Sequence, residues 1–143
     1  MTVQRAVWSE GTPTILAVDP GPHAGLVVVS PDTKLLYHYD NIATTEWVQF
    51  YSLMRVYRPS VVVVELFIAF GKVERRAVIT MECVGVVKVC AQLLTVPVVG
   101  QTPNKIQGWE KIAKERLHHI TRNPHVCDAY AHALAFVDDR VIP

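Results

Sequence analysis

Four consecutive valines followed by a glutamate, at residues 61–65, constrain the fold of this chain more than any other feature of its sequence. A strand with one solvent face alternates apolar and polar residues, so an unbroken β-branched run predicts a strand that is covered on both faces. Glu65 then closes a buried strand, where a carboxylate is costly to desolvate unless a cation compensates it. The segment predicts a central strand of an α/β sheet with an acid at its carboxyl end.

The patterns around this strand predict the remaining elements. Short aliphatic runs between turn residues predict strands, whereas helical spacing, or an apolar run too long for a strand, predicts a helix. We expect strands at residues 15–19, 25–30, 34–39, 61–65 and 96–100, the first three as an antiparallel meander. We expect helices at residues 46–57 and 72–94, a basic helix after Thr102-Pro103 that Gly108 interrupts, and a last helix at 125–137 after an Asn123-Pro124 cap. This order predicts a central mixed five-stranded sheet with helices on both faces.

Length and composition fit one globular domain. The chain has 143 residues, of which 50% are hydrophobic and 19% charged, which excludes a disordered protein. We expect an irregular leader at residues 1–13 and a single domain at 14–143. The longest uncharged apolar run, at 93–100, is too short to cross a bilayer, and residues 1–9 lack a signal-peptide pattern. Three cysteines without C-x-x-C spacing are expected to be core thiols. These observations predict a cytoplasmic protein without a membrane partner.

The charge is small but unevenly distributed. A net charge of +1 is by itself poor support for a nucleic-acid partner. Residues 70–76 nevertheless hold Lys72, Arg75 and Arg76 against Glu74 alone. Residues 101–125 hold Glu110 and Glu115 against five cations, which are Lys105, Lys111, Lys114, Arg116 and Arg122. These cations either contact phosphate groups or form solvated helix faces.

Three acids lie at positions that are unusual for an acid. Asp19 closes an apolar strand before a Pro-Gly turn, where it could also simply bond turn amides. Glu65 closes the valine strand, and Asp128 lies in an apolar helical stretch on the same face as His125 and His132. If the first and fourth strands are neighbours, Asp19 and Glu65 meet at one edge of the sheet, and the last helix can bring Asp128 and His125 to them.

Such a cluster has a definite chemistry. Crowded carboxylates repel one another unless divalent cations neutralise them, and oxygen ligands favour Mg²⁺ or Mn²⁺. Two such ions about 3.5–4 Å apart can activate a water and stabilise the leaving oxygen in phosphodiester hydrolysis. The three acids and His125 are therefore chemically sufficient for a nuclease.

Taken together, the motifs resemble those of the RuvC-type Holliday junction resolvases. The resemblance spans residues 15–136 and rests on Val18-Asp19-Pro20-Gly21 with Gly25, on Val64-Glu65 followed by aromatic residues, and on His125-x-x-Asp128-Ala129. It implies the ribonuclease H-like fold and a metal site of Asp19, Glu65, His125 and Asp128 that holds Mg²⁺ or Mn²⁺, with two ions. It also implies a homodimer that makes paired nicks in a four-way DNA junction, in a bacterial cell or, for a phage protein, in its host.

The resemblance implies further DNA contacts. An aromatic residue after the glutamate, Phe67 or Phe70, would stack on junction bases. Lys105, Lys111 and Lys114 would contact phosphates, and we add Lys72, Arg75 and Arg76 as candidates for DNA binding. His132 is expected to pack or to support a ligand rather than to bind metal. The chain offers no obvious extra surface for docking a branch-migration helicase.

The sequence also allows three alternative interpretations. A sugar-kinase or actin-like fold also starts with D-x-G on a first strand, but needs two such domains. A YqgF-like ribonuclease shares the fold and most acids, and would act on structured RNA. A zinc-bound adaptor would use ligands from a set without standard zinc spacing, namely His118, His119, His125, Cys127 and Cys83.

The long helix predicts self-association. Residues 76–94 are apolar on most sides, more than one stripe against a sheet requires. In a chain this short we expect a symmetric partner to cover the outer side, with Gly85 allowing close approach. The alternative is a monomer in which the outer side packs beneath the last two helices.

Overall fold

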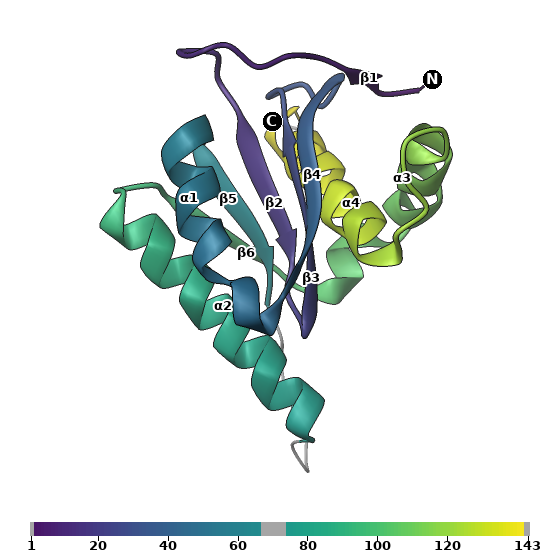
Figure 1. Ribbon diagram of the computed structural model, residues 1–143. Helices are drawn as coiled ribbons and strands as arrows, with labels where there is room; N and C mark the ends of the chain where they lie inside the picture. Colours follow the sequence, from purple (N-terminus) through teal and green to yellow (C-terminus); the bar gives the residue numbers. More distant parts are fainter. Residues whose placement is uncertain (1, 67–73, 142–143) are drawn as a thin grey trace.

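One mixed sheet lies between two helical layers in the computed structural model, which describes residues 2–66 and 74–141 (Figure 1). The strands are β1 (Gln4–Arg5), β2 (Ile15–Asp19), β3 (His23–Val29), β4 (Leu35–Ala43), β5 (Val61–Glu65) and β6 (Val98–Gln101). The α-helices are α1 (Val48–Tyr57), α2 (Arg75–Leu93), α3 (Trp109–Leu117) and α4 (Pro124–Val141). Two short 3₁₀ helices, η1 (Thr44–Glu46) and η2 (Pro103–Ile106), precede α1 and α3.

The strands follow the spatial order β1-β4-β3-β2-β5-β6. β2, β3 and β4 form the expected antiparallel meander, because proline-containing turns reverse the chain between them. β5 and β6 lie parallel to β2 on its other side, since helices carry the chain back before each of them. The valine run is therefore an interior strand, as its sequence predicts.

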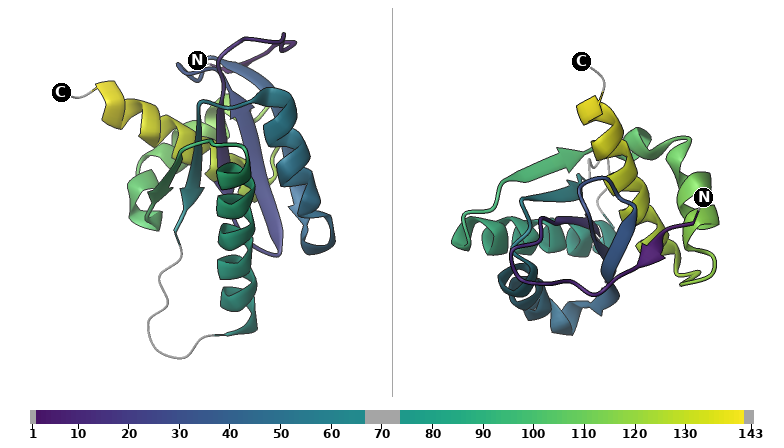
Figure 2. Two further views of the ribbon diagram at one scale, coloured as in Figure 1. Left: turned by 90° about the vertical axis from the view of Figure 1, so that its left-hand side faces the viewer. Right: turned by 90° about the horizontal axis from the view of Figure 1, so that it is seen from above.

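The two faces of the sheet have separate cores. Alternate residues of a strand point to opposite faces, so Val62 and Val64 pack with α1 and α2, whereas Val61 and Val63 pack with η2, α3 and α4. The right-hand view of Figure 2 shows the two helical layers on either side of the sheet. Consequently the outer side of α2 does not pack beneath the last two helices, contrary to the alternative arrangement considered for it.

The sheet is larger than the sequence predicts. The leader contributes β1, which pairs parallel with β4 and makes the sheet six-stranded. β4 continues to Ala43 instead of ending near residue 39, because Asp40 and Asn41 pair with Leu26 and Gly25 of β3. Both differences arise because the segment pairs with a neighbouring strand. The strand propensity of the segment's own residues does not predict such pairing.

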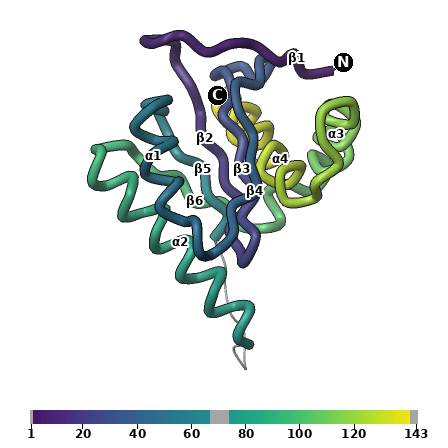
Figure 3. Tube along the Cα trace, in the orientation of Figure 1, coloured from purple at the N-terminus to yellow at the C-terminus, as the bar shows by residue number. Residues whose placement is uncertain are grey.

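The N-terminal leader contacts both helical layers, at the end of the sheet opposite the carboxyl end of β2 (Figure 3). Its Val3 amide donates to the Arg116 carbonyl of α3 at 3.4 Å, and its Trp8 ring lies edge-on to Tyr57 of α1 at 5.3 Å. The three cysteines are free and buried, in agreement with core thiols. No helix within the described ranges is long and apolar enough to cross a membrane.

Candidate active site

Asp19 and Glu65 meet at one edge of the sheet, because β2 and β5 are parallel neighbours that pair Val18 with Val64. Asp19 is only 7% exposed, and Glu65 is half-buried. Burial, the negative charge of Glu65 and a proton shared with it raise the pKa of Asp19 to about 8. Burial also acts to raise the pKa of Glu65, but the neighbouring His132 and Asp19 side chains outweigh it and leave that pKa below its ordinary value. The Asp19 carboxyl is therefore protonated more readily than a free side chain, because it is buried beside a second carboxyl.

Helix α4 brings three polar side chains to this edge. His125, Asp128 and His132 lie three and four residues apart, so they share one face of the helix. Asn123 fixes the start of the helix, since its Oδ1 accepts from the amides of His125 at 3.0 Å and Val126 at 3.1 Å. The two histidines contact different carboxylates. His125 Nδ1 lies 3.1 Å from Asp19 Oδ2, and His132 Nε2 lies 3.5 Å from Glu65 Oε1.

Asp128 belongs to the same electrostatic environment. Burial raises its pKa, as do the charges of Glu110 on α3 and of Glu65, while His132 and Lys114 act in the opposite direction. Glu110 was not predicted as part of the site, because only the packing of α3 on α4 brings it there. Its one sequence signal is its place among the cations of the basic helix.

The donor set suits a hard cation, since it consists of three carboxylates and an imidazole. In the ranges the structure describes, no three histidine, cysteine or carboxylate side chains are placed closely enough to hold one ion without rearrangement. The raised pKa values of Asp19 and Asp128 fit a cation, because burial and neighbouring carboxyls both disfavour their negative charge and a cation would offset it.

Gly25 allows α4 to approach the sheet. A Cβ at this position would lie well inside van der Waals contact with the carbonyl carbon and oxygen of His125. Because those atoms belong to the backbone, no side-chain rotation could relieve the clash. Gly25 is also the β3 partner of Asp19, so this contact sets the distance between the strand end and the helix.

Gly25→Ala is therefore expected to displace the first turn of α4. We expect a loss of about 1–3 kcal/mol in the free energy of unfolding, as for other overpacked sites, measured by urea denaturation. The matched control is Gly21→Ala in the adjacent turn, where a Cβ would meet only Thr80 Oγ1, at 4.0 Å. Equal stability of the two variants would contradict the close approach.

The carboxyl cluster also predicts how stability depends on pH. The pKa of Asp19 is about 8 in the folded protein against 3.8 for a free side chain, so folding takes up a proton between these values. This stabilisation is complete below the lower value and is lost as the pH rises through the higher one. We expect the melting temperature of the protein in chelator to fall as the pH rises from about 4 to about 8, and then to level off. Asp19→Asn should flatten the profile, and an unchanged slope in that variant would contradict the assignment.

The predicted DNA-binding residues fall into three groups. Phe67, Phe70 and Lys72 lie outside the described residues. Arg75 and Arg76 are exposed at the start of α2, and Arg76 is near enough to Asp19 to lower its pKa, against the larger effects that raise it. On the other face of the sheet, Lys111 and Lys114 are exposed on α3, whereas Lys105 forms an exposed ion pair with Asp139 at 3.2 Å.

The residues considered as zinc ligands of an adaptor do not lie together. Cys83 lies in the core under α1 and α2, and Cys127 lies in the core on the opposite face of the sheet. His118 and His119 are exposed at the end of α3. The sheet therefore separates the proposed zinc ligands.

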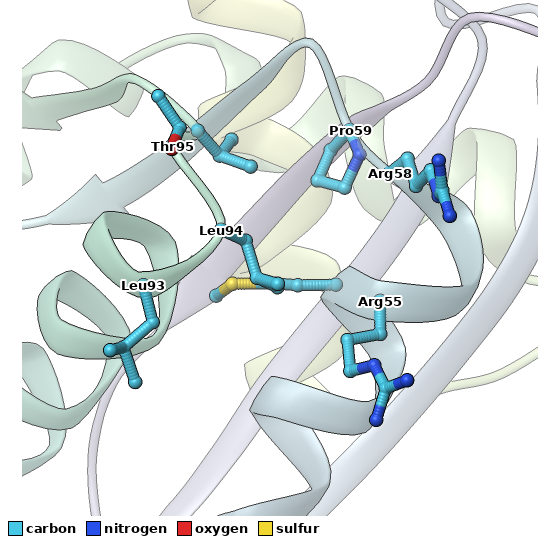
Figure 4. Close-up of a pocket in the computed structure, with 8 residues that line it drawn as sticks. Arg55, Arg58, Pro59, Leu93, Leu94 and Thr95 are labelled. Atoms are coloured by element: carbon cyan, nitrogen blue, oxygen red, sulfur yellow. The ribbon is translucent and has the colours of Figure 1, made fainter.

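A separate hollow of about 490 Å³ lies between the ends of α1 and α2 (Figure 4). Its lining includes Arg55, Arg58, Leu93 and Leu94 and contains neither an acid nor a histidine. It therefore lacks the groups that the acid cluster supplies, and it is not a candidate active site.

The strand order and the acids at the carboxyl edge define an α/β fold of the ribonuclease H-like class. The sequence matches no protein-family profile and no curated protein. Among solved structures the chain is similar to Thermus thermophilus RuvC in complex with a Holliday junction, with 23% identity, a TM-score of 0.76, and 90% of this chain and 96% of that chain covered. It thus has the fold of RuvC.

Two further structures share this fold with lower identity. The Fowlpox virus resolvase, solved with Holliday junction DNA, is 14% identical with a TM-score of 0.63, over 90% of this chain and 99% of that chain. The yeast mitochondrial Holliday junction resolvase Ydc2 is 11% identical with a TM-score of 0.62, over 92% of this chain and 80% of that chain.

Proposed function

We propose that this protein is a divalent-metal-dependent endonuclease that resolves four-way DNA junctions. The observation that carries the proposal is the meeting of Asp19 and Glu65 at adjacent strand ends, with Asp128 and His125 brought to them by α4. The similarity of the fold to resolvases from a bacterium, a poxvirus and a yeast mitochondrion supports the choice of substrate.

Asp19, Glu65, Asp128 and His125 would hold Mg²⁺ or Mn²⁺, in two sites. Bound there, the ions would supply an activated water and charge stabilisation at the leaving oxygen. The chain itself contributes the negative charge that attracts the ions, since three carboxyls with perturbed pKa values crowd one edge. His125 holds Asp19 Oδ2 in place from the helix side.

The DNA would be held by cations on both sides of the acid cluster. Arg75 and Arg76 lie at the start of α2, on one face of the sheet, and Lys111 and Lys114 lie on α3, on the other. Phosphate contacts from two sides suit a branched substrate whose arms leave the site in different directions. The aromatic stacking residue implied by the resemblance, Phe67 or Phe70, remains part of this proposal.

We further propose a homodimer built on the outer face of α2. Val78, Met81, Val89 and Leu93 are 40%, 39%, 56% and 69% exposed. They form one stripe at helical spacing with Gly85, which has no heavy atom within 4 Å of a Cβ built on it. Four exposed apolar side chains around an open glycine suit a second copy of the same helix, and two copies would supply the two sites that paired nicks require.

The test compares a labelled four-way junction, a linear duplex and an RNA hairpin, each with Mg²⁺, Mn²⁺ or chelator. We expect cleavage of the junction alone, in both metals and not in chelator, and none by the Asp19→Asn control. Preferential cutting of the hairpin would instead support the YqgF-like ribonuclease. Failure to cut any of the three in either metal would remove the proposed activity.

A further inference from the structure

His132 is completely buried although it is not part of the proposed metal site. It lies two turns beyond His125 on α4, over the ends of β5 and β6. Those strands pair Glu65 with Gln101, so both side chains leave the sheet on the same face, next to each other. Gln101 is 4% exposed. His132 and Gln101 are thus enclosed by the protein, and Glu65 lies half-buried beside them.

The ring nitrogens of His132 have different partners. Nδ1 lies 2.7 Å from Gln101 Oε1, so the ring donates its Nδ1 proton to the amide oxygen. Nε2 is buried and has no hydrogen-bond partner of ordinary geometry among the described residues. The polar atom that it faces is Glu65 Oε1, at 3.5 Å.

A proton must lie between Nε2 and Glu65. With Nδ1 protonated, a neutral ring would turn an Nε2 lone pair towards a carboxylate oxygen, and two buried acceptors in contact are unfavourable. Exchanging the amide oxygen and nitrogen of Gln101 leads to the same conclusion. Nδ1 would then accept a hydrogen bond from the amide nitrogen, so the proton of a neutral ring would lie on Nε2, facing Glu65. A small rotation of the half-buried glutamate would bring the 3.5 Å separation into the ordinary range of about 2.7–3.2 Å.

We propose that Gln101 and His132 position Glu65: the histidine, anchored by the amide, donates from Nε2 to Oε1 and leaves the second oxygen free for the ion site beside Asp19. His132 is thus a positioning residue. This inference rests on the proposed function, since it concerns a ligand of the proposed metal site. Two turns of α4 would then restrain both strand-end acids, His125 for Asp19 and His132 for Glu65.

The first test measures Mn²⁺ affinity without DNA, by the electron paramagnetic resonance signal of free Mn²⁺. We expect His132→Leu and Gln101→Leu to weaken binding about 10- to 100-fold, as the loss of a group that orients a metal ligand does elsewhere. His132→Gln keeps an N–H donor near the Nε2 position and should recover much of the affinity. Wild-type affinity in folded His132→Leu would overturn the proposal and make His132 a packing residue.

The matched control is Tyr130→Phe. Tyr130 is also fully buried on α4, and its hydroxyl donates to the Thr33 carbonyl at 2.9 Å, away from the acids. The control therefore loses one buried hydrogen bond of the same helix, and we expect reduced stability with unchanged Mn²⁺ affinity. If affinity follows melting temperature across all variants, including this one, the effect is structural and the positioning role is wrong.

The second test does not depend on metal. In protein with ¹⁵N-labelled histidine, at one pH and in chelator, we expect a slowly exchanging Nε2 proton on His132. Glu65→Gln should shift this resonance strongly, and Tyr130→Phe should leave it in place. A His132 resonance that ignores Glu65→Gln would overturn the inference. If the His132 resonance shifts in Glu65→Gln but the protein binds no Mn²⁺, the contact between His132 and Glu65 stands and the proposed metal-dependent nuclease is wrong.

Discussion

Removal of a single charge from the acid cluster is expected to abolish cleavage while junction binding is kept. Asp19→Asn, Glu65→Gln and Asp128→Asn should each lower the rate of junction cleavage at least about 100- to 1,000-fold, because each removes charge that stabilises the transition state. The rate is measured in single-turnover assays with Mg²⁺. Binding is measured by fluorescence anisotropy with Ca²⁺, and should stay within a few-fold of wild type because the phosphate contacts lie elsewhere.

The control for this prediction is Asp139→Asn. Asp139 is an exposed acid of the same helix that pairs with Lys105 outside the cluster, so its loss removes an equal charge from α4. We expect cleavage near the wild-type rate. Substantial cleavage by any one of the three cluster variants would remove that residue from the site, and equal losses in all four variants would point to a general effect of charge.

The second prediction concerns the outer face of α2. Val89→Glu places a charge in the middle of the apolar stripe, where burial against a second copy would be costly. We expect wild-type protein to show twice the 16.0 kDa mass of one chain in light scattering, and Val89→Glu to show the mass of one. On a supercoiled plasmid with a cruciform, paired nicks give linear product, so the variant should shift the products to relaxed circles.

Val56→Glu is the matched substitution, because Val56 has the same 56% exposure as Val89 but lies on α1, off the stripe. We expect it to remain dimeric and to give linear product. Dissociation by both variants would mean that the interface is not the α2 stripe. Wild-type protein that is monomeric at micromolar concentration and still linearises the plasmid would contradict the dimer altogether.

The sequence was sufficient for the elements whose pattern is local. The valine run predicted an interior strand with Glu65 at its end, and Gly108 predicted the break before α3, where its φ is +86°. Each of these depends on residues adjacent in the chain. From the sequence alone it could only be assumed that β2 and β5 are neighbours, since no residue within either strand specifies which strand it pairs with.

The sequence was insufficient where tertiary contact decides. β1 has two polar residues without strand propensity, and it forms because the edge of β4 offers unpaired backbone groups. Gln101 follows a glycine and gives no sign of burial, yet its pairing with Glu65 brings it beneath His132. The role of His132 depends on which side of α4 faces the acids. The spacing of apolar residues indicates the buried side of a helix only approximately.

The arrangement of His125, Asp128 and His132 on one face of α4 has a consequence for how this chain can diverge. One residue inserted between His125 and His132 would turn everything beyond it by about 100° and would separate the two histidines from their carboxylates in a single step. An insertion beside the exposed Asp32, in the turn between β3 and β4, would move no residue of the cluster. Insertions and deletions in related sequences are therefore expected in the turns. The first two turns of α4 should keep the same number of residues, even where their side chains differ.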